Sequence, residues 1–227
     1  MITLTIAAIL WVALHVVVAG PLRPALVARL GEAAYRGLFS LASALSLGAM
    51  IWAYPQAPYV EFWPTTEAVA LVPLLVMPVA LLFLVASLRP TNPTLAGPDM
   101  IMKGELPVVG FTKVTRHPML WAFSLWAISH MIANGDAATW LLAGAVLFTA
   151  LNGMGSIDRK RAAKFGVVWQ RFADKTSIVP MVAVMEGRQK LSFEDIGWMN
   201  ILMAAALYAL FMWGHAIFFG VPVMPIY

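Results

Sequence analysis

The chain contains no cysteine and few charged residues. The absence of cysteine among its 227 residues excludes disulfide bonds and thiolate metal sites. Only 11% of the residues are charged, whereas a soluble domain has about a quarter. In their place, 61% of the residues are hydrophobic, and the mean hydropathy is +0.81. This composition excludes an ordinary soluble domain and predicts a polytopic membrane protein.

Six segments are long and apolar enough to cross a bilayer, which takes about 20 residues. The shortest segment is 118–134. Its flanking residues support a helix there, because Pro118 suits a first helical turn and Asn134-Gly135-Asp136 favours a turn at its end. We therefore expect an all-α, polytopic membrane helix bundle that forms a single domain over residues 1–227. The expected transmembrane helices are roughly 2–20, 36–54, 67–88, 118–134, 137–155 and 198–219.

Residues 156–197 follow the fifth expected span and are amphipathic with a helical period. Their apolar positions include Phe165, Trp169 and Phe172, and basic residues lie between them. A helix of this kind lies in the interface of a membrane with its apolar face buried. We expect it to leave the membrane after residue 155 and to lie along the cytoplasmic face.

The basic residues are confined to alternate loops. All fifteen Lys and Arg lie between or beside the first and second, the third and fourth, or the fifth and sixth expected helices, with Arg36 at the first residue of the second helix. The positive-inside rule then places these loops in the cytoplasm and both termini in the periplasm, as in a bacterial inner-membrane protein. The basic residues are explained as topology signals and as contacts with lipid headgroups, so no nucleic-acid partner is expected.

Four histidines lie within or beside the expected helices: His15, His117, His130 and His215. An ionisable residue at membrane depth is by default a candidate for function. The alternative is a neutral imidazole that bonds a carbonyl or a serine of a facing helix. His117 and His130 are about 19 Å apart along one helix and about 140° apart around it. We therefore expect His117 to face a cytoplasm-side site and His130 to face the bundle interior.

A histidine that faces the bundle interior is a suitable axial ligand for haem iron. Two such ligands place their Cα atoms about 12 Å apart, because each iron–nitrogen bond is about 2 Å long. The estimated difference in depth is about 12 Å between His15 and His130, and about 6 Å between His130 and His215. Both pairs therefore stay open on the residues alone.

Several blocks of the chain resemble the NnrU family of bacterial membrane proteins. They are "LHVVVAGPLRPALVARLGEAAYRGLFSL", "TRHPMLWAFSLWAISHMIANGD", "GMGSIDRK" and "FGVVWQRFADKTSIVP". The family is associated with denitrification, so the resemblance implies a role in nitrogen-oxide metabolism.

The same blocks are similar to those of plant zeta-carotene isomerases, which are haem b membrane enzymes. That resemblance implies that His15 and His130 are the axial ligands of a haem b, in preference to His215. Ala127 stands where those enzymes have a cysteine that can serve as an alternative ligand. A redox-dependent exchange of ligands is therefore not expected here.

The Arg116-His117-Pro118 motif is also similar to one in membrane methyltransferases that use S-adenosylmethionine. The resemblance implies that His117 and Asp158 form a cytoplasm-side site for that cofactor. This chain departs from the pattern, since Leu120 replaces a tyrosine and Ile157 replaces a glutamate. The alternative is that the motif only starts a helix.

The resulting expectation is an NnrU-type membrane protein that binds haem b and acts in nitrogen-oxide metabolism or in a haem-dependent isomerisation. Its partners would be the lipid bilayer and either a hydrophobic small-molecule substrate or a membrane reductase. Two alternatives remain: a methyltransferase-like protein that uses S-adenosylmethionine, and a non-enzymatic assembly factor for a membrane reductase.

The distribution of charge makes a prediction about topology. Reporter fusions at Gln56, Asp136 and the C-terminus should report a periplasmic location, because the adjoining loops carry no Lys or Arg. Fusions at Arg29 and Arg188 should report a cytoplasmic location. A cytoplasmic C-terminus would contradict the count of six spans.

Overall fold

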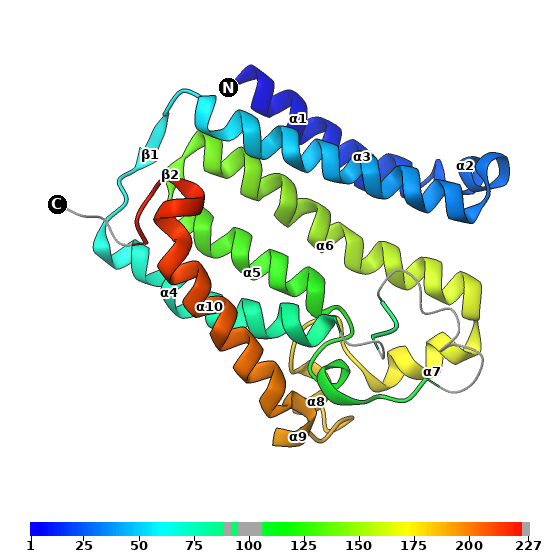
Figure 1. The fold of residues 1–227 in the computed structure, drawn as a ribbon. Helices are drawn as coiled ribbons and strands as arrows, with labels where there is room; N and C mark the ends of the chain where they lie inside the picture. The colour runs from blue at the N-terminus through cyan, green and yellow to red at the C-terminus, as the bar shows by residue number, and fades with distance from the viewer. Residues whose placement is uncertain (89–91, 95–105, 224–227) are drawn as a thin grey trace. The chain divides into compact units, whose positions relative to one another are not determined.

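The structure is a computed structural model that describes residues 1–88, 92–94 and 106–223, and it is mostly helical (Figure 1). The expected all-α class is confirmed in this part of the chain, with one short two-stranded ribbon added. The elements are α1 (Ile2–Ala13), a π-helical segment (Leu14–Val18), α2 (Arg23–Leu30), α3 (Glu32–Ala53), a 3-10 turn (Tyr54–Gln56), β1 (Glu61–Trp63), α4 (Glu67–Ser87), a second 3-10 turn (Gly110–Lys113), α5 (Pro118–Ala133), β2 (Gly135–Asp136), α6 (Ala137–Phe165), α7 (Val167–Lys175), α8 (Val182–Met185), α9 (Phe193–Ile196) and α10 (Trp198–Phe219).

Several of these helices are suited to cross a membrane. Four helices, namely α3, α4, α6 and α10, are long and apolar enough. A fifth span is possible if Ile2–Val18 and Arg23–Leu30, which are bent by 78° relative to each other, count as one. Helix α5 is apolar but has only 16 residues. The chain is therefore a membrane protein with several transmembrane helices, each of which falls on a predicted segment.

The described residues form two compact units, and the first comprises Met1–Pro73 and Ala127–Gly153. In this unit α1 packs against α3 and α6 (Figure 1). Leu4 and Met50 are fully buried at the centre of the contact, and the residues around them are mostly alanines. Small residues let helix backbones approach closely, which is how helices pack where lipid removes the hydrophobic driving force.

The strands β1 and β2 pair antiparallel in the first unit, next to the turn between α5 and α6. Two indoles satisfy carbonyls at the end of α5: the Trp63 Nε1–H bonds Ile132 O at 3.0 Å, and the Trp140 Nε1–H bonds Met131 O at 3.2 Å. Asp136 then starts α6 by accepting bonds from the backbone N–H and the hydroxyl of Thr139. The break between two helices that the sequence predicted at 134–136 is thus confirmed, although Gly135 and Asp136 form the strand β2 there.

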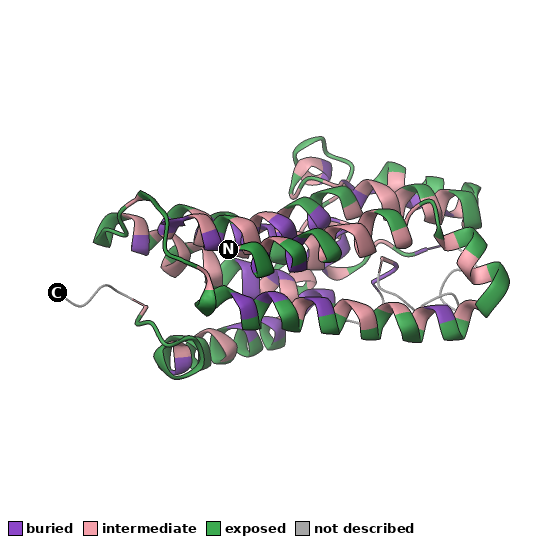
Figure 2. Ribbon diagram, turned by 90° about the horizontal axis from the view of Figure 1, so that it is seen from above, coloured by how far each residue is buried: buried purple, intermediate pink, exposed green. Residues whose placement is uncertain are grey.

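The second unit comprises Leu74–Trp126 and Met154–Tyr227. Here α10 packs on α4 through Leu81, Val85 and Ala204. The Tyr208 hydroxyl crosses between these helices and donates to Leu74 O at 3.0 Å. Figure 2 colours the chain by burial and shows buried residues as narrow stripes on helices whose other faces are exposed. Such exposed apolar faces are typical of helices surrounded by lipid.

The amphipathic segment differs in one respect from its expected form. There is no break at residue 155, because α6 continues to Phe165 and ends only at Gly166, whose φ of 53° is unfavourable for other residues. Helix α7 follows, with Trp169 and Phe172 buried on one face against Leu106. The predicted amphipathic period is therefore confirmed over α7, whereas residues 156–165 belong to the membrane helix α6.

Two glycines provide a matched test of the packing in the first unit. A Cβ at Gly135 would overlap the backbone oxygen and the indole of Trp63, whereas a Cβ at Gly144 meets no atom within 4 Å. Gly135→Ala should lower the stability by about 1–3 kcal/mol through overpacking. Gly144→Ala, in the middle of α6, should raise it by about 0.5–1 kcal/mol. Thermal unfolding in detergent measures both, and an unchanged Gly135→Ala variant would contradict the close contact.

Candidate functional site

His15 lies in the π-helical segment at the end of α1. Single π-helical turns within helices are rare and occur frequently at functional sites. The His15 Nδ1 lies 2.8 Å from the carbonyl oxygen of Trp11. A carbonyl only accepts, so Nδ1 carries the proton, and Nε2 keeps a lone pair. Among the residues that the structure describes, Nε2 has no hydrogen-bond partner.

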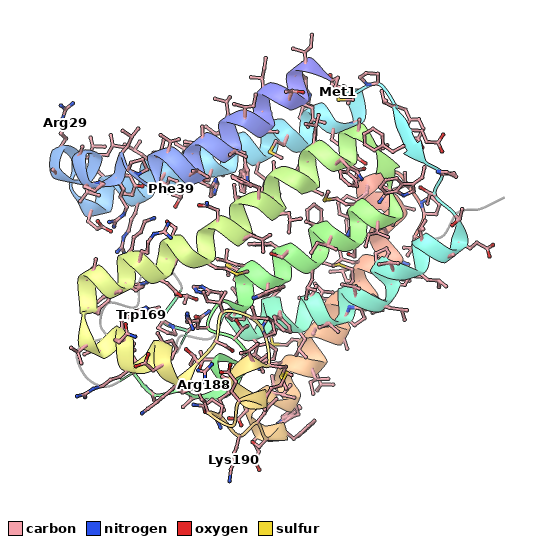
Figure 3. All side chains as sticks on the ribbon, turned by 180° about the vertical axis from the view of Figure 1, so that it is seen from behind. Met1, Arg29, Phe39, Trp169, Arg188 and Lys190 are labelled. Carbon is pink, nitrogen blue, oxygen red and sulfur yellow. The ribbon has the colours of Figure 1, made fainter. Side chains whose placement is uncertain are left out.

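Two aromatic rings flank the imidazole of His15. The Trp11 ring centroid lies 4.0 Å away with an interplanar angle of 35°, and the Phe39 ring centroid lies 5.4 Å away edge-on. Phe39 projects from α3 and is labelled in Figure 3. The Trp11 indole in turn donates its Nε1–H to the hydroxyl of Thr149 on α6 at 3.0 Å. Residues from three helices therefore define the surroundings of this imidazole.

His130 lies in the same unit, on α5, but far from His15 along the bundle. The position of each histidine along α6 can be estimated from a nearby hydrogen bond. Trp11 on α1 bonds Thr149 on α6, and Trp140 on α6 bonds the carbonyl of Met131 on α5. His15 is one turn beyond Trp11, and His130 is next to Met131. Their separation along α6 is then about 12 residues, or about 18 Å. This estimate is larger than the separation of about 12 Å expected for two ligands of one haem.

His130 and His215 each have local partners. The Nδ1 of His130 lies 3.4 Å from the Ser129 hydroxyl. The Nδ1 of His215, in the second unit, donates to the carbonyl of Val221 at 2.8 Å. No group of three or more His, Asp or Glu that could hold a metal ion occurs in the described part of the chain.

The structure does bring His117 and Asp158 together. The His117 Nε2 lies 2.8 Å from Asp158 Oδ1, while Asp158 Oδ2 accepts from Arg116 Nε at 2.8 Å and from Arg116 Nη2 at 2.7 Å. The side chains are 0% exposed for His117, 11% for Arg116 and 16% for Asp158. The sequence analysis missed Arg116 as the partner, although Asp158 is the one acidic residue in the basic stretch 156–165.

This ion pair is closed toward a ligand. Asp158 already accepts three hydrogen bonds, two at Oδ2 and one at Oδ1, and its side chain is mostly buried, so little of the carboxylate is left for a cofactor. A hollow of about 450 Å³ lies beside the pair, but it is lined by Arg116 and Arg188 and by neither His117 nor Asp158. The geometry favours a structural role, in which the start of α5 is fastened to α6.

Neighbouring bonds extend this fastening to residues 176–183. The Thr115 hydroxyl and the Trp121 indole both donate to the carbonyl of Ile178, at 2.6 and 2.8 Å. The backbone N–H of Arg116 donates to Ser177 O. The motif therefore positions the segment after α7 as well as the start of α5.

The ion pair and a more exposed pair form a matched test. Asp158→Ala leaves the Arg116 guanidinium buried and unpaired and should cost about 3–5 kcal/mol. Glu32→Ala removes pairs with Arg23 and Arg36 whose side chains are 35–41% exposed, and it should cost about 0–1 kcal/mol. Thermal unfolding of both variants in detergent checks the difference. Equal losses would show that the Arg116–Asp158 pair is not effectively buried.

Comparison with known proteins agrees with the resemblance seen in the sequence. The chloroplastic 15-cis-zeta-carotene isomerase of Zea mays is 33% identical over 86 residues, which cover 36% of this chain and 22% of that protein. The Arabidopsis thaliana enzyme of the same name is 32% identical over 93 residues, which cover 39% of this chain and 24% of that protein. The matched stretch is thus less than a quarter of either relative. No solved structure matches the chain significantly. The family model described as NnrU protein matches residues 3–223, and this membrane protein therefore belongs to the NnrU family.

Proposed function

We propose that this NnrU-family protein binds haem b through His15 and uses it to isomerise a double bond of an apolar polyene. The observation that carries the proposal is the state of the His15 imidazole, whose Nδ1–H is held by the Trp11 carbonyl while Nε2 stays without a partner among the described residues. Histidines that bind metal ions almost always donate the other ring N–H in this way. The substrate class comes from the names of the two plant relatives.

The residues around His15 fit one axial ligand of a haem. The imidazole presents Nε2 from a half-buried position, and Trp11 and Phe39 supply apolar surface for a macrocycle. Haem, when bound, supplies an iron centre in an apolar environment that can interact with a double bond of the substrate. The chain's own contribution is to hold and orient His15 and to limit the access of water to it.

The second axial position is a separate question, because His130 is about 18 Å from His15 along α6. A pair of histidine ligands needs about 12 Å between Cα atoms. His130 therefore becomes the second ligand only if α1 slides along α6 by about one turn, which is 5.4 Å. Without that shift, His15 would be the one histidine of this pair that holds the haem.

The proposed setting is the bacterial inner membrane, with six spans and both termini in the periplasm. It is supported by the alternation of basic loops, with the bent α1–α2 pair and the short α5 completing the set of four long helices. A bilayer location gives an apolar substrate a route to the protein through lipid. The association of the family with nitrogen-oxide metabolism, and a membrane reductase as partner, remain predictions of the resemblance.

The test of haem binding is a visible spectrum of protein purified in detergent after haem-replete expression. Wild type should show a Soret band that is lost in His15→Ala. His215→Ala is the matched control and should keep the band, because its imidazole is bonded within its own helix end. If wild type shows no Soret band, the histidines are structural and the assembly-factor alternative leads.

The His130→Ala variant reports on the second ligand in the same experiment. An unchanged band agrees with the separation of the two histidines in the structure. A change from a low-spin to a high-spin spectrum shows that α1 moves so that His130 reaches the iron. Isomerase activity is then checked by incubating the haem-loaded protein with a 15-cis polyene and separating the isomers by chromatography. Conversion equal to that of His15→Ala would overturn the proposed reaction.

A further inference from the structure

We propose that Trp11 and Thr149 are positioning residues for His15: the Trp11 carbonyl sets its tautomer, and the Trp11 indole, anchored by Thr149, sets the orientation of its ring. This inference rests on the proposed function, because it concerns the presentation of Nε2 to haem iron. The juxtaposition that carries it is a continuous series of contacts, from Thr149 on α6 through Trp11 on α1 to His15 in the π-helical segment.

Trp11 contacts its neighbours with both its backbone and its side chain. Its carbonyl oxygen accepts the His15 Nδ1–H at 2.8 Å, one turn further along the chain. Its indole lies 4.0 Å from the imidazole, centroid to centroid, and so covers one side of the ring. Its Nε1–H points away and donates to Thr149 Oγ1. The indole can cover the imidazole in this orientation only while its N–H has that acceptor.

Thr149 is suited to be that acceptor because its own proton is already committed. The residue is 8% exposed, and its hydroxyl donates within α6 to the carbonyls of Ala145 and Val146, each at 3.0 Å. Its lone pairs are therefore directed at Trp11. In an apolar interior, a tryptophan N–H that loses its acceptor costs the desolvation of that group, so the indole would turn to find another partner.

Phe39 limits the imidazole on another side. Its ring meets the imidazole edge-on at 5.4 Å, and it stacks in turn on Tyr35 at 6.0 Å. The imidazole thus has Trp11 and Phe39 as aromatic neighbours and the Trp11 carbonyl at Nδ1. Nε2, the nitrogen that would bind iron, is left without a hydrogen-bond partner among the described residues. The tautomer and orientation of His15 are therefore suited to bind a metal ion before any haem is bound.

The first test uses protein without haem, so its result does not depend on the proposed function. Nitrogen-15 NMR of protein with labelled histidine should show His15 in the Nδ1–H form, with His15→Ala assigning the signal. In Thr149→Val the ring is less confined, and part of the population should change to the Nε2–H form. Tyr54→Phe is the matched control, because it removes another aromatic-to-threonine bond, to Thr139 at 2.8 Å. An unchanged tautomer in Thr149→Val would overturn the inference.

The second test measures haem affinity by titration of the apoprotein. Trp11→Phe keeps an aromatic ring and the carbonyl but lacks the N–H, and Thr149→Val lacks the acceptor. Each should weaken haem binding by about 10-fold to 100-fold, the usual effect of losing a group that orients a metal ligand. Because Thr149 acts through Trp11, the double variant should bind haem no more weakly than the single variant with the lower haem affinity. Tyr54→Phe should bind as wild type does.

The two ideas fail in different ways. If wild-type protein binds no haem, the proposed function is wrong, and the tautomer measurement still decides whether Trp11 and Thr149 position His15. If wild type binds haem but the two single variants bind equally well, the positioning role is wrong and the haem proposal stands. Additive losses in the double variant would show that Thr149 does not act through Trp11.

Discussion

A polar hydrogen placed in an apolar interior must find an acceptor inside the protein, and this constraint governs how the described helices are joined. Four indole N–H groups illustrate it. Trp63 and Trp140 donate to carbonyls at the end of α5, Trp121 donates to the carbonyl of Ile178, and Trp11 donates to the hydroxyl of Thr149. Each bond joins residues at least nine positions apart in the sequence. Where lipid removes most of the hydrophobic driving force between helices, such bonds and close packing fix which surfaces meet.

The same constraint is met in different ways at His117 and at His15. At His117, Asp158 bonds the imidazole Nε2 and also the Arg116 guanidinium, while Nδ1 is buried and has no hydrogen-bond partner among the described residues. The carboxylate already accepts three hydrogen bonds from these two residues, and the arrangement fastens the start of α5 to α6. At His15 only Nδ1 is satisfied, by a carbonyl of its own helix. Both imidazoles therefore have one nitrogen without a partner, but the His117 side chain is fully buried whereas His15 is only half buried. This difference in burial is why the functional proposal is placed at His15.

The bond from His15 to the carbonyl of Trp11 lies where α1 passes into the π-helical segment. An ordinary α-helical turn would pair the carbonyl of Trp11 with a backbone N–H four residues later. In this structure the Trp11 carbonyl accepts the backbone N–H of Leu14 as well as the Nδ1–H of His15. At this point the His15 imidazole is held at one nitrogen by the Trp11 carbonyl and has aromatic neighbours from the same helix and from α3.

The membrane class, the positions of the helices and the family could all be predicted from the sequence, because they follow from local composition, spacing and motifs. Apolar runs of sufficient length, a turn at 134–136 and the period of α7 are properties of short stretches of chain. The closeness of His117 and Asp158 was also suggested by the motif. The pairing of Asp158 with Arg116 was not, since it depends on the rotation of two helices about their axes.

The distance between His15 and His130 and the contact of Trp11 with Thr149 were decided only by the tertiary structure. Both depend on how far one helix is displaced along another, and a hydrophobic pattern that repeats along every helix leaves that displacement undetermined. A depth estimate from residue counts assumes upright helices that begin at the same level. Specific long-range hydrogen bonds remove that freedom, because an indole and a hydroxyl 138 positions apart can meet at only one displacement of α1 along α6.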